Sequence, residues 1–195
     1  MNWIFSYLGE IAGALTLLAF VPFIIAILQK KAKPSIITWT TLTIMNILLI
    51  KSYYDSGART TLWLPIAFLI GDIVICLLSF KYGEKIITKI DKICIGLIVI
   101  NILSILLLSY NKDIVLSLSI VTLSIGAFPT IKKSWLRPWG ENKTAWSMFA
   151  TAAILNVIAI QNWSSIAIIA HPIYAFTFDV SVAMILWIKS KKRPA

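Results

Sequence analysis

The sequence predicts an all-α membrane protein of seven transmembrane helices, arranged as 3+1+3 with two parallel three-helix repeats. Three observations support this: an apolar composition, seven long apolar stretches, and basic residues concentrated in alternate loops. Hydrophobic residues make up 59% of the 195 residues and charged residues only 13%, and the mean hydropathy is +0.88. Soluble domains carry roughly 25% charged residues, so this composition argues against a soluble domain.

The apolar stretches can be assigned directly along the chain. They cover residues 3–28, 36–54, 61–80, 92–110, 113–132, 144–161 and 165–188. Most reach the roughly 20 residues with which an α-helix, rising about 1.5 Å per residue, crosses about 30 Å of hydrocarbon. We expect the first stretch to remain as a helix, because no basic residue precedes it and no small-residue cleavage site of a signal peptide follows it.

The basic residues indicate how the helices are oriented. Fifteen of the 18 lysines and arginines follow the first, third, fifth and seventh stretches, and the other three are Lys51, Arg59 and Lys112. Cytoplasmic loops carry such an excess, which predicts an inner (plasma) membrane protein with the amino terminus outside and the carboxyl terminus in the cytoplasm. The net charge of +10 is therefore interpreted as a topology signal, with membrane lipids rather than nucleic acid as the anionic partner.

Rare residue types recur at a fixed offset. A shift of 107 residues matches Pro22 with Pro129, Trp39 with Trp146, Pro65 with Pro172, and Asp72 with Asp179. We therefore predict a first repeat in residues 1–88, a linker helix in 89–111 and a second repeat in 112–195. Three helices reverse the direction of the chain and the linker helix restores it, so the repeats are expected to lie parallel about an axis along the membrane normal.

The helix plan and the matched prolines resemble the SWEET and PQ-loop superfamily, whose members carry a proline-containing motif in the first and fifth helices. Pro22 and Pro129 stand at the expected places, while Phe23 and Thr130 replace the namesake glutamine, which implies a divergent, bacterial-type member. The resemblance implies alternating access by two rocking bundles around a central site for a sugar, an amino acid or a vitamin. A lumenal-peptide receptor of the secretory pathway shares the plan, so a receptor or assembly factor without transport is the alternative.

Two aspartates are the most informative residues. Asp72 and Asp179 lie near the middle of their predicted helices, where a carboxylate costs roughly 2.5 to 3.5 kcal/mol. One reading is structural, with hydrogen bonds to neighbouring helices through Asn46 or Asn156. The other reading places both acids in the central cavity, where the resemblance implies asparagines. An acid in place of an amide favours a cationic substrate or coupling to protons.

Four prolines are candidate hinge or gate residues. Pro65 and Pro172 each precede an aspartate by seven residues, which is two helical turns, so proline and aspartate share one helix face. Pro22 and Pro129 lie near the predicted inner ends of their helices. A proline frees a backbone carbonyl and permits bending, although a passive kink is an equally good interpretation.

Several further side chains are candidates for substrate binding. Trp39, Trp146 and Trp163 with Tyr174 offer stacking faces, and Asn46 and Asn156 offer hydrogen bonds, to a polar ring or planar group. For each of these residues alone, packing or anchoring at the membrane interface is the competing explanation.

The sequence gives little support for a catalytic, metal-binding or cofactor-binding site. The single histidine, His171, and the acid in the first helix, Glu10, have no assigned role, and the two cysteines, Cys76 and Cys94, are expected to be free thiols. Metal-ligand spacings, glycine-rich phosphate loops and nucleophile sets are missing from the sequence, which predicts no metal, no cofactor and no enzyme activity. The sequence leaves the identity of the solute and the oligomeric state open.

Overall fold

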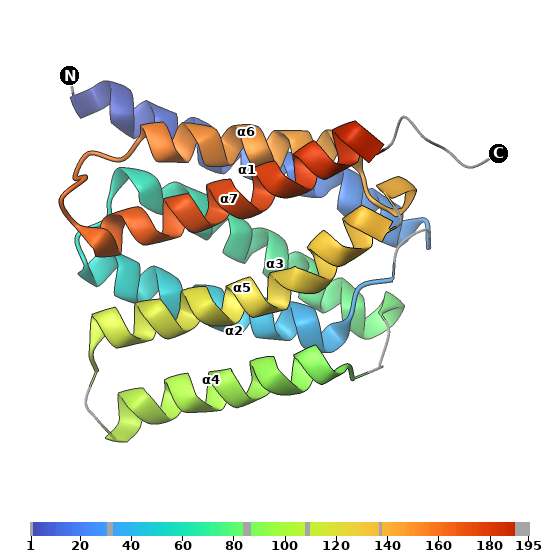
Figure 1. The fold of residues 1–195 in the computed structure, drawn as a ribbon, viewed down its shortest axis with the longest axis horizontal. Coiled ribbons are helices and arrows are strands. Elements are labelled where there is room, and N and C mark those ends of the chain that lie inside the picture. The colour runs from blue at the N-terminus through green and yellow to red at the C-terminus, as the bar shows by residue number, and fades with distance from the viewer. Residues whose placement is uncertain (1, 31–32, 84–86, 108–109, 137, 190–195) are drawn as a thin grey trace.

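The computed structural model describes residues 2–30, 33–83, 87–107, 110–136 and 138–189. Within these ranges the regular structure is helical, without a strand, which confirms the predicted all-α class (Figure 1). The helices are α1 (Asn2–Leu28), α2 (Ile36–Asp55), α3 (Trp63–Tyr82), α4 (Lys89–Leu107), α5 (Lys112–Leu136), α6 (Lys143–Ile158) and α7 (Ile166–Lys189). Short 3₁₀ turns precede α3 (η1, Thr60–Leu62) and α6 (η2, Pro138–Gly140).

Six of these helices are long and apolar enough to cross a membrane, so the chain is a membrane-embedded, multi-pass protein. They are α1 from Tyr7, α2, α3 with η1, α4, α5 and α7. Helix α6 has only 16 residues, which is about 24 Å and less than the roughly 30 Å of hydrocarbon. The sequence predicted a span up to residue 161, but the helix ends at Ile158 and Ala159 caps it.

Helix α4 begins three residues before the apolar stretch that predicted it. The backbone N–H of Asp91 donates to the hydroxyl of Thr88, and the Asp91 carboxylate accepts from the N–H and hydroxyl of Thr88. This reciprocal pairing is a capping box, which starts a helix among polar residues. The other oxygen of Asp91 accepts from the hydroxyl of Thr38 on α2 at 3.0 Å. The cap therefore also fixes α4 to α2.

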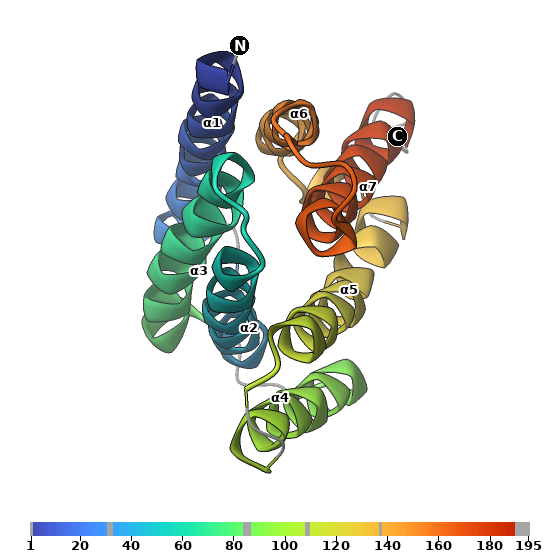
Figure 2. The ribbon, with the colours of Figure 1, turned by 90° about the vertical axis from the view of Figure 1, so that its left-hand side faces the viewer.

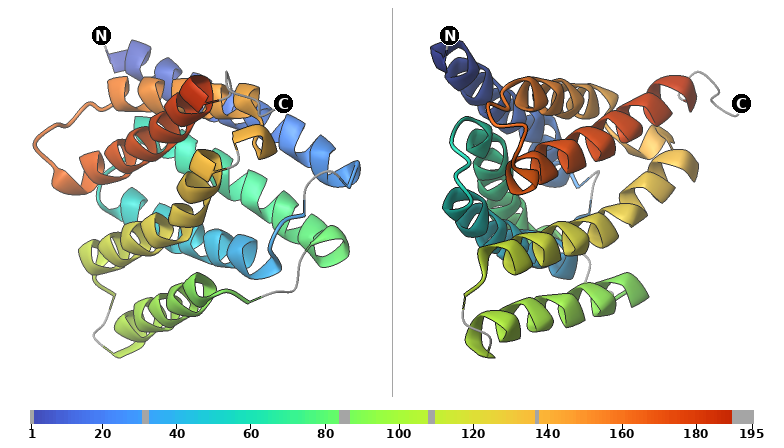
Figure 3. Two further views of the ribbon diagram at one scale, coloured as in Figure 1. Left: turned by 45° about the vertical axis from the view of Figure 1, so that its right-hand side comes forward. Right: turned by 60° about the vertical axis from the view of Figure 1, so that its left-hand side comes forward.

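The helices form two groups of three with α4 at one edge (Figures 2 and 3). Helix α3 packs against both α1 and α2, and α7 packs against both α5 and α6. The groups meet where α1 contacts α6 and where α2 contacts α5. Helix α4 contacts α5 and α2 and lies away from α1 and α6.

Alternate connections lie at the same end of the bundle (Figure 1). Helices α1, α3, α5 and α7 end on the right-hand side of that view, and α2, α4 and α6 begin there. We call this the basic end, because its described residues include Lys30, Lys33, Lys81, Lys89, Lys92, Lys132, Lys143 and Lys189. At the opposite, far end, Lys51 forms an ion pair with Asp55, and Lys112 donates to the Asp55 backbone carbonyl.

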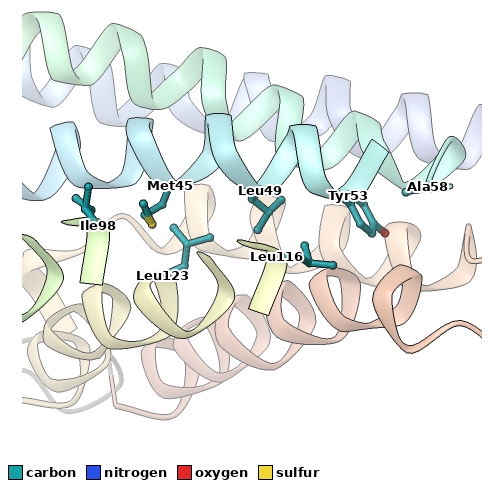
Figure 4. Packing of buried hydrophobic residues seen from close by; sticks show 7 residues of the cluster. All are labelled: Met45, Leu49, Tyr53, Ala58, Ile98, Leu116 and Leu123. Atoms are coloured by element: carbon teal, nitrogen blue, oxygen red, sulfur yellow. The ribbon is translucent and has the colours of Figure 1, made fainter. Parts of the chain in front are cut away.

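Buried apolar side chains fill the space between α2, α4 and α5 (Figure 4). Met45, Leu49 and Tyr53 extend from α2 toward Leu116 and Leu123 of α5. All five are less than 5% exposed. This cluster forms one of the two contacts between the helix groups.

A second cluster closes the contact between α1, α3 and α6. Phe20 of α1 lies edge-on to Phe149 of α6, with ring centroids 5.1 Å apart. Phe68 of α3 stacks on the same Phe149 ring at 5.4 Å. Aromatic pairs of this kind add about 0.5–1.5 kcal/mol each beyond their buried area.

Two glycines let α1 approach the start of α3. A Cβ at Gly9 would collide with the backbone carbonyl of Thr60, and one at Gly13 would lie 3.0 Å from the backbone oxygen of Trp63. Small residues four apart allow such close approach in membranes, where lipid provides no hydrophobic force between helices. The Gly9 and Gly13 pair therefore sets the position of α1.

We predict that Gly9→Ala lowers the free energy of unfolding by about 1–3 kcal/mol, because the added methyl group overpacks this contact. Thermal unfolding in detergent measures the effect. Gly96→Ala on α4 is the matched control, because no atom lies within 4 Å of a Cβ placed there. Equal melting temperatures for the two variants would contradict the described packing of α1.

Candidate functional site

Asp72 is buried in α3 and held by an amide. Its side chain is 3% exposed, and it lies ten residues before the last residue of α3. The Nδ2 of Asn46 on α2 donates to its Oδ2 at 2.6 Å. Of the partners that the sequence suggested for the two acids, this is the one that the structure brings together.

Asp179 occupies the corresponding place in α7 without such a partner. Its side chain is 1% exposed, ten residues before the last described residue of α7, and its Oδ2 finds no hydrogen-bond partner within the described ranges. The position 107 residues after Asn46 is occupied by Ala153, which is fully buried. The second acid therefore lacks the amide that stabilises the first.

Tyr174 lies between His171 and Asp179 along α7, and its side chain packs against the buried cluster between α2, α4 and α5. Its ring stacks on that of Phe178 at a centroid distance of 6.3 Å and an interplanar angle of 3°. An aromatic face therefore lies on α7 directly before Asp179.

His171 and Asn156 add buried polar atoms near the far end. His171 is 2% exposed, and its ring lies 5.7 Å from that of Tyr53 and 6.2 Å from that of Tyr174. Asn156 is fully buried. The His171 Nδ1 and both amide atoms of Asn156 find no hydrogen-bond partner among the described residues. An unsatisfied buried group costs about 1–3 kcal/mol, so these three atoms and the Asp179 oxygen are candidates for contacts to a ligand, whereas Asn101 Oδ1 and Ser134 Oγ, also unpartnered among the described residues, lie on other helices.

The candidate tryptophans divide into two kinds. Trp39 packs on Phe23 at 5.6 Å, and Trp146 packs edge-on to Phe178 at 5.6 Å. Trp146 thereby extends the aromatic face that begins at Tyr174. Trp163 is 57% exposed in the turn between α6 and α7, so the structure places it apart from the buried set.

The four prolines are not equivalent in the structure. Pro22, Pro129 and Pro172 lie inside α1, α5 and α7. Pro65 is the third residue of α3, where an N–H has no partner within the helix, so it costs that helix no hydrogen bond. Of the matched pair Pro65 and Pro172, only Pro172 lies beyond the first turn of its helix, where a proline removes a backbone hydrogen bond.

Tyr53 is a residue that the sequence analysis did not select. Its hydroxyl donates to the backbone carbonyl of Ile168 at 2.8 Å and accepts from the hydroxyl of Thr61 at 2.6 Å. Thr61 and Ile168 also line a pocket of about 220 Å³ between residues 56–61 and 161–162. Tyr53 therefore ties the two helix groups together through two residues that line this pocket. A tyrosine near a polar helix end is typical of an interfacial anchor, so the sequence pattern gives no signal for this contact.

We predict that Asn46→Ala lowers the free energy of unfolding by about 1–3 kcal/mol, because it leaves the Asp72 carboxyl buried without a donor. The loss should shrink in an Asp72→Ala background. A double-mutant cycle of unfolding in detergent measures this coupling. Additive effects of the two substitutions would show that the hydrogen bond contributes nothing to stability.

A group of three or more His, Cys, Asp and Glu residues that could hold a metal ion does not occur in the part of the chain that the structure describes.

The chain was compared with known families, proteins and structures. No protein-family model matches the chain, and neither a curated protein nor a solved structure matches it.

Proposed function

We propose that this chain is a seven-span membrane transporter that moves a small polar solute by alternating access. The observation that carries the proposal is the pair of buried carboxyls, Asp72 and Asp179, each near the middle of the helix that packs against the other two helices of its group. Intramembrane acids are costly and typically line ion or substrate pathways. The unpartnered atoms of Asn156 and His171 extend the same polar region toward the far end.

The buried faces of α3 and α7 support a relation between the two groups. Five buried residues of α3 are matched, 107 positions later, by five buried residues of α7: Leu64 with His171, Pro65 with Pro172, Asp72 with Asp179, Ile75 with Val182, and Ser79 with Leu186. The contacts between the groups correspond as well. If α1 is equivalent to α5 and α2 to α6, then the contact of α1 with α6 is equivalent to the contact of α5 with α2. We infer two parallel units in residues 1–88 and 112–195, with residues 89–111 as the linker.

Alternating access in this arrangement is a rocking of one group against the other. Helices α1 and α5 each contact the opposite group and each contain a proline, Pro22 or Pro129. The carbonyls that these prolines free would let the helices bend near the basic end. At the far end, the hydrogen bonds from Tyr53 to Ile168 and from Thr60 to Ala159 join the groups, and we infer that the rocking motion breaks them when that side opens.

We predict that solute uptake depends on pH and that the Asp72→Asn/Asp179→Asn double variant flattens this dependence. Asparagine keeps the size and hydrogen bonding of aspartate but does not titrate. The measurement is uptake into proteoliposomes from about pH 5 to pH 8, with solutes chosen by ligand-induced thermal stabilisation. Asp113→Asn is the matched control, because Asp113 is exposed. Wild-type rates and pH profile in the double variant would exclude this role, and binding without uptake would favour a receptor.

We further predict that the basic end faces the cytoplasm. Fifteen of the 18 lysines and arginines follow the first, third, fifth and seventh apolar stretches, which end there. In a Cys76→Ala/Cys94→Ala background, a membrane-impermeant thiol reagent should label Asn162→Cys at the far end in intact cells. It should label Lys33→Cys only after lysis. Both positions are exposed, so the reverse labelling pattern would invert the topology.

A further inference from the structure

The two halves of the buried site offer different chemistry. At matched positions α3 carries Leu64, Ala67 and Gly71, whereas α7 carries His171, Tyr174 and Phe178. Helix α6 carries Asn156 where α2 carries Leu49. At these matched positions the hydrogen-bonding and aromatic groups lie on α6 and α7, whereas Asn46 on α2 is already bonded to Asp72.

The two aspartates of the site also differ in their hydrogen-bond partners. The buried residues that the structure describes include Asp72 and Asp179 but no lysine or arginine. Asp72 has the Asn46 amide at 2.6 Å, while the Oδ2 of Asp179 lacks a partner in the described ranges. Burying a carboxylate without a partner is costly, so a ligand that brings its own positive charge is favoured at Asp179 and an anion is disfavoured.

An ammonium group suits this position. It supplies charge-assisted N–H donors to the carboxylate. The Tyr174 ring stacks on that of Phe178, the residue before Asp179, and is the kind of face that attracts organic cations.

The remaining unpartnered atoms lie farther along the bundle. His171 precedes Asp179 by eight residues, about 12 Å of helix rise. Asn156 lies two residues from the far end of α6. Together the His171 Nδ1 and the Asn156 amide offer donor and acceptor capacity, which matches a neutral polar group such as a hydroxyl. A ligand that contacts both regions must be extended.

We propose that α6 and α7 form the recognition half of the site and bind an extended organic ammonium compound with a neutral polar group at its other end. Asp179 binds the ammonium, and His171 with Asn156 binds the polar group. Asp72, already bonded to Asn46, contributes little to affinity. The inference rests on the proposed function only for the route by which the solute enters the bundle.

The first test measures binding to the purified chain in detergent by calorimetry. The probes are ω-amino alcohols of four to eight carbons, the diols and alkylamines of equal length, and the corresponding ω-hydroxycarboxylates. At the best length, the amino alcohol should bind at least tenfold tighter than the diol, the alkylamine should bind with intermediate affinity, and the hydroxycarboxylate should not bind. Diols that bind as tightly as amino alcohols at every length, or no binding by any amino alcohol, would overturn the proposal.

The second test separates the two halves. Asp179→Asn should weaken amino-alcohol binding at least tenfold, and the matched variant Asp72→Asn less than threefold. His171→Leu and Asn156→Leu install the residues found at the matched positions 64 and 49. They should remove the advantage of the amino alcohol over the alkylamine and leave alkylamine binding unchanged. These two variants replace unsatisfied polar groups with apolar ones, so they are expected to fold. A larger loss in Asp72→Asn than in Asp179→Asn would refute the assignment.

Uptake into proteoliposomes distinguishes this inference from the proposed function. Amino-alcohol binding without uptake of any solute would refute transport and leave the recognition half intact. Uptake of a neutral solute without amino-alcohol binding would refute the recognition half and leave transport intact.

Discussion

The free energy of an unpartnered polar group in hydrocarbon governs this structure. Backbone groups escape the cost by forming helices, and carboxyls escape it only by turning inward. Within each group the helix that carries the aspartate accordingly packs against both of the others, α3 against α1 and α2, and α7 against α5 and α6. Close packing at Gly9 and the Phe149 cluster then holds these helices in place, since lipid provides no hydrophobic force between them.

Much of the fold could be predicted from hydropathy, and the deviations have local causes. Helix α4 starts early because Thr88 and Asp91 form a cap, to which a hydropathy profile gives no weight. Helix α6 ends at Ile158 and is capped by Ala159, although apolar residues continue through Ile160. The end of a helix depends on a few hydrogen bonds at its cap, whereas hydropathy shows only which segments are apolar enough to lie in lipid.

The site was harder to predict than the fold, because partners depend on helical register. Asn46 and Asn156 looked equally suited to pair with an aspartate, but only Asn46 lies in register with one. At the position matched to Asn46 stands Ala153, three residues before Asn156. The role of Tyr53 could not be predicted for a different reason. A tyrosine at a polar helix end resembles an interfacial anchor, and its partner Ile168 lies 115 residues away in the sequence.

The Tyr53 contact also bears on how evenly two arrangements of the helix groups could be populated. In the proposed transporter, the hydrogen bonds from Tyr53 to Ile168 and from Thr60 to Ala159 both join the groups at the far end. Each neutral hydrogen bond contributes about 0.5–1.5 kcal/mol net, which is roughly a two- to tenfold bias in an equilibrium constant. Two such bonds favour closure at the far end but are weak enough to break, so the packing of α1 on α6 and of α2 on α5 also holds the groups together.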